Sequence, residues 1–257
     1  MFIRNYLPQS ISSALWGNRK RWGLTINQSD MCWQEWQRTY SKFYTENQRQ
    51  GIGTRVNDSG YNVMNKIDLT GKRVLEIGAG DIRHTDYWQG MPSEYILADI
   101  SPEMLNKAKL RLKEKEVPYR SFLLKRSGVL PVDDASIDVV VSFYSLEHLY
   151  PLEPYLTEIS RVLCSGGVLI GAIPAEGGLA WGLGRAITSR RWFKKNTTID
   201  PDKIICWEHP NFADDVIIDL EHQFERINVT YWPLRAPLLD INLIIRFIYK
   251  KKLIHES

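Results

Sequence analysis

The stretch that decides the fold is RVLEIGAGDIR, residues 73–83. Its first half, VLEI at 74–77, is a short apolar run that predicts a buried strand. Gly78 and Gly80 follow directly, and a residue without a side chain lets the backbone approach a ligand closely or take up a positive φ. A glycine loop at the carboxyl end of a strand is where open α/β sheets bind nucleotides. A simple glycine turn in any α/β protein would carry the same residues, so the neighbouring sequence has to decide.

An acidic residue follows the loop at the spacing typical of nucleotide-binding units. We expect a helix over 81–89, after which the apolar run YILADI at 95–100 predicts a second strand. This run contains Asp99, which lies 19 positions beyond Gly80. An acid roughly 20 residues after the glycines accepts hydrogen bonds from ribose hydroxyls in such units. Strand, glycine loop, helix, strand and acid therefore occur in the order that a βαβ nucleotide-binding unit requires.

Strands and helices continue to alternate beyond this unit. Ser101 is a good N-cap and Pro102 suits a first helical turn, so a helix is expected there. The run IDVVVSF at 137–143 is almost continuously apolar, as a strand covered on both faces should be. The other expected elements are strands at 119–124, 168–173 and 225–232, a helix from Pro154 to the glycines at 166–167, and a helix at 211–224. This alternation predicts an α/β fold with a doubly wound, Rossmann-like, mostly parallel sheet.

Residues 1–69 are predicted to form an aromatic-rich helical extension before a main domain at 70–257. Between Asp30 and Gln50, aromatic residues recur every three or four positions and give a helix one aromatic face. We expect this face to pack on the main core; the alternative is that some rings line a substrate pocket. Gly51 and Gly53 are expected to end the helix. The aromatic positions are Trp33, Trp36, Tyr40, Phe43 and Tyr44.

Residues 174–211 interrupt the alternation and are predicted to be a basic and aromatic cap insertion. Between Gly177 and Ile199 there are five basic residues and no acid, interleaved with aromatic side chains. Most charge runs are solvated faces, and a solvated helical excursion is one interpretation. The sharper hypothesis is a cap over the carboxyl edge of the sheet that binds an anionic substrate, because guanidinium groups bind phosphate or carboxylate bidentately. The substrate-binding candidates in this cap are Arg185, Arg190, Arg191 and Trp181.

The C-terminal tail has two interpretations. The run NLIIRFIY at 242–249 has the composition of a strand and can complete the sheet as an edge or antiparallel strand, which we favour. Alternatively it forms an interfacial helix, with the lysines at 250–252 facing anionic lipid. The second interpretation would give the protein a peripheral contact with a membrane.

Composition narrows the class of protein. With 257 residues and 44% hydrophobic content, the chain is long enough for one large domain and a smaller elaboration. A net charge of +3 is too small to indicate nucleic acid as a partner. Three widely spaced cysteines without a CxxC pair suggest neither a disulfide framework nor zinc, which favours a reducing cytoplasm, and no other metal-ligand spacing stands out. Without a signal peptide or an apolar run of roughly 18 residues, we expect a cytoplasmic protein, soluble or peripheral to the inner face of the membrane.

Four motifs in sequence order resemble one enzyme family. They are VLEIGAG, the acid in YILADI, LPVDDASIDVVVSFYSLEHL and LTEISRVLCSGGVLIGAIP. Together, over roughly residues 70–175, they resemble the class I S-adenosylmethionine-dependent methyltransferases, and most of all the small-molecule enzymes typified by quinone-biosynthesis methyltransferases. The resemblance implies a sheet of seven strands with the last inserted antiparallel, and S-adenosylmethionine as the methyl donor.

The resemblance also implies which residues contact that cofactor. Asp99 matches the acid that binds the ribose hydroxyls, and Ile100 the apolar neighbour of adenine. Two positions depart from the family pattern: Ile82 stands where a third glycine is usual, so the loop should be tighter or displaced there, and Arg126 or Ser127 stands where a polar or acidic residue contacts adenine. The remaining matches are Glu76, Gly78, Ala79 and Gly80 near the methionine moiety, and Ser142, Phe143 and Tyr144 beside the methionine moiety and the acceptor.

Two other classes of protein compete with this interpretation. A nicotinamide or flavin site would need GxGxxG, but counting from Gly78 puts Arg83 at the third glycine position, where close helix packing requires a hydrogen. An NAD-dependent dehydrogenase therefore fits poorly. The third class is a non-catalytic binding subunit with a methyltransferase fold.

Methyl transfer from a sulfonium is an in-line displacement, in which the protein mainly aligns the reactants. A hydroxyl acceptor also needs a base, and the catalytic candidates are His148 in SLEHL and His209, which Glu208 precedes and could orient. His84 is a weaker third, and each histidine could equally be a structural residue satisfied by backbone hydrogen bonds. The expected acceptor is a small molecule or glycan; one hypothesis is an anionic sugar on a nucleotide or lipid diphosphate in surface-polysaccharide assembly. A quinone precursor or another small aromatic is the alternative.

Overall fold

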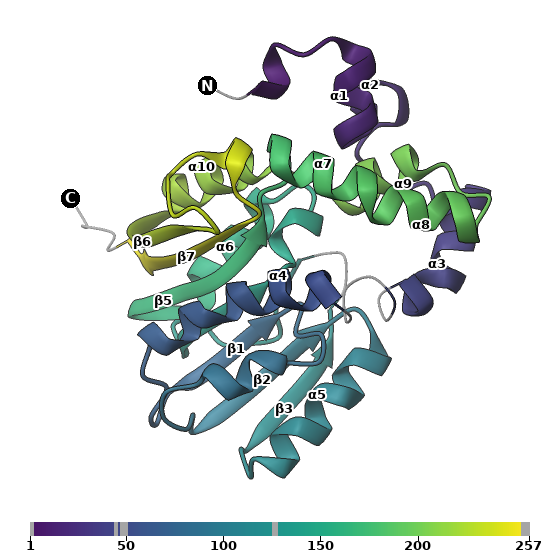
Figure 1. Cartoon of the computed structure of the whole chain (residues 1–257). Coiled ribbons are helices and arrows are strands. Elements are labelled where there is room, and N and C mark those ends of the chain that lie inside the picture. The colour runs from purple at the N-terminus through teal and green to yellow at the C-terminus, as the bar shows by residue number, and fades with distance from the viewer. Residues whose placement is uncertain (1–2, 44–45, 47–50, 125–127, 253–257) are drawn as a thin grey trace.

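The computed structural model describes residues 3–43, 46, 51–124 and 128–252 (Figure 1). Tyr44, Arg126 and Ser127, named above as candidates, lie outside these residues. The described chain forms a seven-stranded sheet with helices on both faces and a further group of helices beyond the carboxyl ends of the parallel strands.

The sheet has the strand order β3-β2-β1-β4-β5-β7-β6, with the first five strands in this order parallel. Only β7 breaks the parallel arrangement, because it pairs antiparallel with both β5 and β6. The prediction of a seven-stranded, mostly parallel sheet with the last strand inserted antiparallel is therefore confirmed. The strands are β1 (Arg73–Ile77), β2 (Glu94–Asp99), β3 (Tyr119–Leu123), β4 (Ile137–Phe143), β5 (Leu163–Pro174), β6 (Phe224–Trp232) and β7 (Ile244–Lys251).

The tail is part of this sheet, so the interfacial-helix interpretation is wrong. The side chain of Lys251 donates a 2.6 Å hydrogen bond from Nζ to the carbonyl of Leu163 at the start of β5. Lys252 likewise donates to the carbonyls of Glu221 and His222. These two lysines therefore hold the end of β7 against its neighbours, and the membrane contact predicted through an interfacial helix loses its structural basis.

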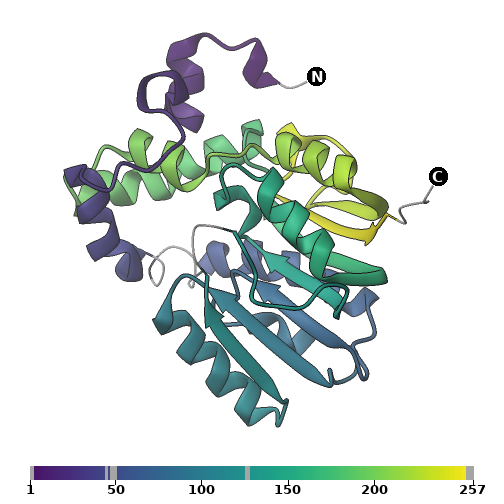
Figure 2. The same ribbon diagram turned by 180° about the vertical axis from the view of Figure 1, so that it is seen from behind.

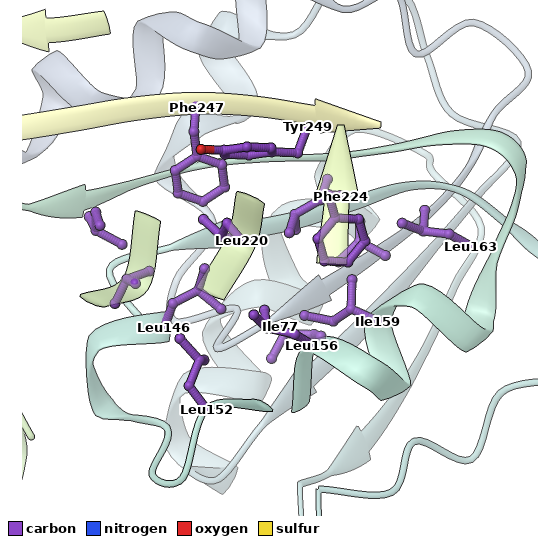
Figure 3. Packing of buried hydrophobic residues seen from close by; sticks show 14 of the residues in the cluster. Ile77, Leu146, Leu152, Leu156, Ile159, Leu163, Leu220, Phe224, Phe247 and Tyr249 are labelled. Carbon is purple, nitrogen blue, oxygen red and sulfur yellow. The ribbon is translucent and has the colours of Figure 1, made fainter. Parts of the chain in front are cut away.

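Helices cover both faces of the sheet (Figures 1 and 2). One face carries α4 (Gly51–Tyr61), η3 (Asn62–Lys66), η4 (Arg83–Tyr87) and α5 (Pro102–Glu114). The other carries α6 (Glu153–Val162) and α10 (Ala213–Gln223). Figure 3 shows the second face, where Leu156 and Ile159 of α6 and Leu220 of α10 pack on Phe224 and Phe247. Full burial of each such side chain contributes roughly 1.5–3 kcal/mol.

The predicted N-cap of α5 at Ser101 is confirmed, whereas the junction of α6 and β5 differs from the prediction. Ser101 Oγ accepts a 3.3 Å hydrogen bond from the backbone N–H of Met104, as expected of an N-cap. However, α6 ends at Val162, and β5 begins at Leu163 instead of Val168. Gly166, with φ at 78°, lies where β5 changes register against β4, so the glycines make an irregularity inside a long strand and do not end a helix.

The glycine-rich segment after residue 50 is a helix, contrary to the prediction that Gly51 and Gly53 would end one. Helix α4 packs against β5 and β7, and this tertiary packing outweighs the poor helix propensity of glycine. Gly60 allows the close approach, because a Cβ there would overlap the hydroxyl of Tyr144. The phenol in turn donates a 2.6 Å hydrogen bond to the backbone carbonyl of Asn57.

The remaining helices form the N-terminal segment and the cap. The N-terminal helices are α1 (Gln9–Trp16), α2 (Arg19–Trp22) and α3 (Met31–Phe43); the cap contains α7 (Leu179–Ile187), α8 (Ser189–Asn196) and α9 (Pro201–Glu208). Figure 1 shows α1 and α2 on the side of the cap that faces away from the sheet. The aromatic face of α3 packs on the cap and not, as predicted, on the main core. Trp33, Trp36 and Phe43 form a separate buried cluster with Trp192 and Phe193.

Within the described residues, no helix combines the length and apolar character needed to cross a bilayer.

Candidate functional site

The glycine loop after β1 packs against the chain that follows β4. Gly78 and Gly80 have φ of 70° and 55°, which favours glycine over residues with a side chain. A Cβ on Gly78 would overlap the side chain of Ser145, whereas the corresponding position on Gly80 faces open space. Ser145 Oγ donates a 2.9 Å hydrogen bond to the carbonyl of Ile77. Sequence reasoning missed Ser145, because its role depends on the pairing of β1 with β4.

Asp99 is fixed at the edge of this loop. Its Oδ2 accepts a 2.8 Å hydrogen bond from the N–H of Gly80, and its Oδ1 a 2.7 Å bond from the N–H of Ser101. Burial raises the pKa of the Asp99 carboxyl, although these amides act in the opposite direction. Next to it, the side chain of Ile100 is 75% exposed, although it follows a buried strand. The predicted ribose acid and the predicted adenine neighbour thus lie together at the loop.

Ile82 explains how the loop continues without a third glycine. Its backbone is left-handed, with φ at 44°, while its side chain is buried. The chain then forms only the short 3-10 helix η4 in place of the helix predicted over 81–89. Ile82, where the sequence departs from the family's glycine pattern, is therefore also the position at which the local structure differs from the predicted helix.

Glu76 lies beneath the loop in a buried hydrogen-bond network. Its carboxylate accepts hydrogen bonds from Tyr95 Oη at 2.6 Å and from His84 Nε2 at 2.9 Å. His84 Nδ1 accepts a 3.0 Å bond from Trp88 Nε1, so the ring is neutral with its proton on Nε2. His84 is thus a structural residue at the floor of the loop. Glu76 supports the loop from below, and its contact with a cofactor stays a prediction.

Hydrogen bonds and ring packing fix the residues at the end of β4 and directly after it. Ser142 Oγ donates to Ser145 Oγ at 2.6 Å, because the proton of Ser145 is already given to Ile77. Phe143 is buried, 6% exposed, with its ring 4.9 Å from that of His84. Tyr144 has a positive φ of 55° and donates its N–H to the carbonyl of Ala172. The three predicted residues therefore form a rigid wall beside the loop.

A buried ionic cluster joins the end of β5 to the cap. Glu176 is fully buried and accepts hydrogen bonds from Trp181 Nε1 at 3.1 Å and from both terminal nitrogens of Arg185. Burial by itself would raise the pKa of Glu176, but Arg185 and His209 outweigh it and hold the pKa well below its usual range. Arg185 and Trp181, predicted to bind substrate, are therefore engaged inside the protein.

The two predicted catalytic histidines lie side by side. The rings of His148, in η5 (Leu146–His148), and His209, after α9, have centroids 4.7 Å apart. Burial lowers the pKa of His209 to about 4, and Glu176 Oε2, 3.2 Å from Nδ1, offsets this only in part. Glu208 does not orient His209. It contacts His148 Nδ1 through its backbone carbonyl and through Oε2 at 3.5 Å.

Glu147 is a functional candidate that sequence reasoning missed. Its side chain is buried, its Oε2 has no hydrogen-bond partner, and its Oε1 lies 3.9 Å from His148 Nε2. Burial raises the pKa of Glu147 to about 7, partly offset by His148. A carboxyl group with such a pKa can accept or release a proton near neutral pH. Its position in SLEHL was visible, but its burial depends on the cap closing over η5.

Asn211 holds the end of the cap on η5. Its Nδ2 donates to the carbonyls of Leu146 at 3.1 Å and Leu149 at 2.7 Å.

The two other arginine candidates of the cap differ in environment. Arg190 forms a 2.6 Å ion pair with Asp202, whereas Arg191 is exposed to solvent. Of the three predicted anion-binding arginines, Arg191 alone forms no ion pair with another described residue.

Two cavities of about 560 and 450 Å³ lie elsewhere on the described molecule, and no predicted site residue lines either of them. In the described part of the chain, no three or more His, Cys, Asp or Glu side chains lie together in a way that could hold a metal ion.

Comparison with known proteins finds a family match over the region that contains the glycine loop and Asp99. Residues 75–171 match the family model described as a methyltransferase domain. The phthiotriol/phenolphthiotriol dimycocerosates methyltransferase of Mycobacterium leprae is 34% identical over 107 residues, which cover 40% of this chain and 38% of that protein. The demethylmenaquinone methyltransferase of Lactococcus lactis is 35% identical over 106 residues, 40% of this chain and 42% of that protein. The chain thus spans less than half the length of the curated relatives that it matches.

The similarity of folds extends further along the chain. The crystal structure of the PH0226 protein from Pyrococcus horikoshii has a TM-score of 0.57 at 18% sequence identity, and the match covers 84% of this chain and 99% of that one. At this identity the likeness shows the fold alone. Over residues 75–171, the strand order, the glycine loop and the family match all indicate the same methyltransferase-like fold.

Proposed function

We propose that this chain, which through residues 75–171 belongs to the class I S-adenosylmethionine-dependent methyltransferases, transfers a methyl group from S-adenosylmethionine to a small-molecule or glycan acceptor. Proteins of this family and fold use S-adenosylmethionine as their methyl donor. Because the matches cover only part of the chain and of its relatives, the activity, the acceptor and the site residues are all parts of this proposal.

The observation that carries the proposal is the arrangement of Gly80, Asp99 and Ile100. Backbone amides fix the Asp99 carboxylate so that its remaining lone pairs can accept hydrogen bonds from the two ribose hydroxyls. Ile100 offers an exposed apolar surface for the adenine ring, and the open space at Gly80 leaves room for a ligand to approach the backbone. These residues fit the cofactor, which when bound supplies a methyl group activated on a sulfonium.

The chain's own part in the reaction is to align the acceptor and, for a hydroxyl, to remove its proton. The exposed ring of His148 can accept that proton, since Glu208 lies at its Nδ1 and Glu147 near its Nε2. His209 lies against this ring and is held neutral by burial at pH 7, so it can accept a proton only at acid pH. We therefore favour His148 over His209 as the base, with Glu147 as the neighbouring proton acceptor.

The finer part of the proposal concerns the acceptor. An anionic sugar linked to a nucleotide or lipid diphosphate is favoured by the exposed cations of the cap, Arg191, Lys194 and Lys195, although Arg185 and Arg190 are paired internally. A quinone precursor is the alternative, because the Lactococcus lactis relative is named for a demethylated menaquinone. A labelled-methyl screen with nucleotide sugars, lipid-linked glycans and quinone precursors separates the two.

Cofactor binding is the direct test. S-adenosylmethionine or S-adenosylhomocysteine should raise the melting temperature, because a ligand at 100 times its Kd stabilises the folded state by about 2.7 kcal/mol. Asp99→Ala should abolish this shift, whereas Asp86→Ala, which removes an exposed carboxylate paired with Lys115, should retain it. No shift with wild type at saturating ligand would overturn the methyltransferase proposal. A normal shift without methyl transfer to any acceptor would instead favour a non-catalytic binding subunit.

A further inference from the structure

A second candidate binding site lies at the far edge of the sheet from β3. A cavity of about 450 Å³ is lined by residues of η3, the edge strand β6, its neighbour β7 and the turn at 233–237. Three cationic side chains line it, those of Lys66, Arg235 and Arg246, together with Asn62 and Thr230. None of the lining residues is acidic, so the cavity carries an uncompensated positive charge.

Among the residues that the structure describes, no carboxylate forms an ion pair with Lys66, Arg235 or Arg246. The side chain of Lys66 donates a 2.9 Å hydrogen bond to Asn228 Oδ1. The Nε of Arg246 is buried without a hydrogen-bond partner. Burial and the nearby charge of Arg235 both lower the pKa of Arg246. An unsatisfied buried donor costs free energy, and an anion in the cavity would satisfy it.

Hydrogen bonds from a buried asparagine hold the turn that carries Arg235. Asn242 is fully buried; its Oδ1 accepts a 2.9 Å bond from Leu234 N–H, and its Nδ2 donates to the carbonyls of Ala236 at 2.9 Å and Leu238 at 2.8 Å. These bonds hold Arg235 in a left-handed backbone conformation, with φ at 56°. Such conformations persist only where the surrounding structure imposes them, and they concentrate at ligand-binding sites.

The same turn exposes apolar side chains next to the cations. Leu234 is 60% exposed, Leu238 58% and Ile241 41%. The acid of this segment, Asp240, is engaged elsewhere, because its oxygens accept from the N–H groups of Ile3 and Leu179. Exposed aliphatic side chains beside a basic pocket match an amphiphilic anion better than a free one, because the aliphatic groups would otherwise stay in water.

We propose that this cavity binds the phosphate of an anionic lipid headgroup at a bilayer surface, while Leu234 and Leu238 enter the acyl boundary. Basic side chains near an anionic membrane are each attracted by about 1 kcal/mol, and the leucines add burial that a soluble phosphate cannot supply. The cavity is connected to the candidate site through the sheet, because Arg246 pairs with Ala172, whose carbonyl accepts the N–H of Tyr144. Lipid binding is nevertheless independent of methyl transfer and can be measured without it.

The test is co-sedimentation of the full chain with vesicles of phosphatidylcholine, with and without phosphatidylglycerol. Wild type should bind the anionic vesicles and not the neutral ones. Arg235→Gln/Arg246→Gln should weaken binding roughly 30-fold, from two surface charges. The matched control Lys20→Gln/Lys113→Gln removes two exposed cations, in α2 and α5, that have no part in the proposed sites, and it should change binding by less than about threefold. Equal loss in both variants, or equal binding of wild type to neutral vesicles, overturns the proposal.

A second variant keeps the test valid if loss of Arg246 perturbs folding. Leu234→Ser/Leu238→Ser changes two exposed residues and leaves every cation in place. It should still weaken binding to anionic vesicles at least tenfold. Glycerol phosphate in solution supplies the same phosphate without acyl chains. If it binds as tightly as the vesicles, and the leucine variant binds vesicles like wild type, the cavity takes free phosphate and the lipid proposal is wrong. The S-adenosylmethionine-dependent melting shift should persist in every variant, which separates this test from that of the proposed function.

Discussion

Replacing Arg185 with methionine distinguishes a structural ion pair from a substrate contact. The Arg185 side chain is 7% exposed and that of Glu176 is 0% exposed, and the guanidinium makes a two-pronged contact with the carboxylate. Removing one partner of a buried pair leaves an uncompensated charge, which costs about 3–5 kcal/mol. For a domain of this size, roughly 2–4 °C per kcal/mol converts that loss into a fall in melting temperature of about 6–20 °C.

Urea unfolding followed by circular dichroism measures this loss. Arg185→Met/Glu176→Gln should recover at least half of it, because the buried charge is removed together with its partner. Arg191→Met, at an exposed position of the same cap, should stay within about 0.5 kcal/mol of wild type. A loss below about 1 kcal/mol for Arg185→Met, together with weakened acceptor binding, would refute the structural role and restore Arg185 as a substrate residue.

Two further outcomes are expected. Glu147→Gln should become more stable than wild type as the pH rises from about 4.5 through 7, and the difference should reach about 3 kcal/mol. The reason is that the raised folded-state pKa of about 7 makes ionised Glu147 unfavourable in the folded protein. Urea unfolding at pH 5 and pH 8 checks this, and a pH-independent difference contradicts it. Gly78→Ala should destabilise by about 1–3 kcal/mol more than Gly80→Ala, because both positions have positive φ but only the first would overlap Ser145; equal melting temperatures for the two variants would show that the loop moves away freely.

The centre of the fold was predictable because its signals are local. The strand at 73–77, the glycine loop, Asp99 and the Ser101 N-cap follow from short-range rules of burial, backbone freedom and capping, and each lies where the sequence placed it. The order of these elements sufficed to predict a mostly parallel sheet. Composition also favoured a strand in the C-terminal tail, although only the pairing of β7 with β5 and β6 excludes the helix.

Tertiary contacts decided what composition could not. Helix α4 forms in a glycine-containing segment because β5, β7 and the Tyr144 hydroxyl lie against it. The aromatic face of α3 packs on the cap because the cap presents Trp192 and Phe193, which the hydrophobic pattern of α3 alone cannot reveal.

The sequence by itself determined the βαβ unit around RVLEIGAGDIR and the class of nucleotide-like ligand that it suits, since spacing along the chain fixes both. Only the tertiary structure decided which charges are free. Arg185 and Arg190 look alike in sequence to Arg191, yet the first two pair with Glu176 and Asp202. Glu147 looks like any surface acid until burial raises its pKa. Charge and hydrogen-bond partners come from residues distant in the chain, and burial sets how strongly they act.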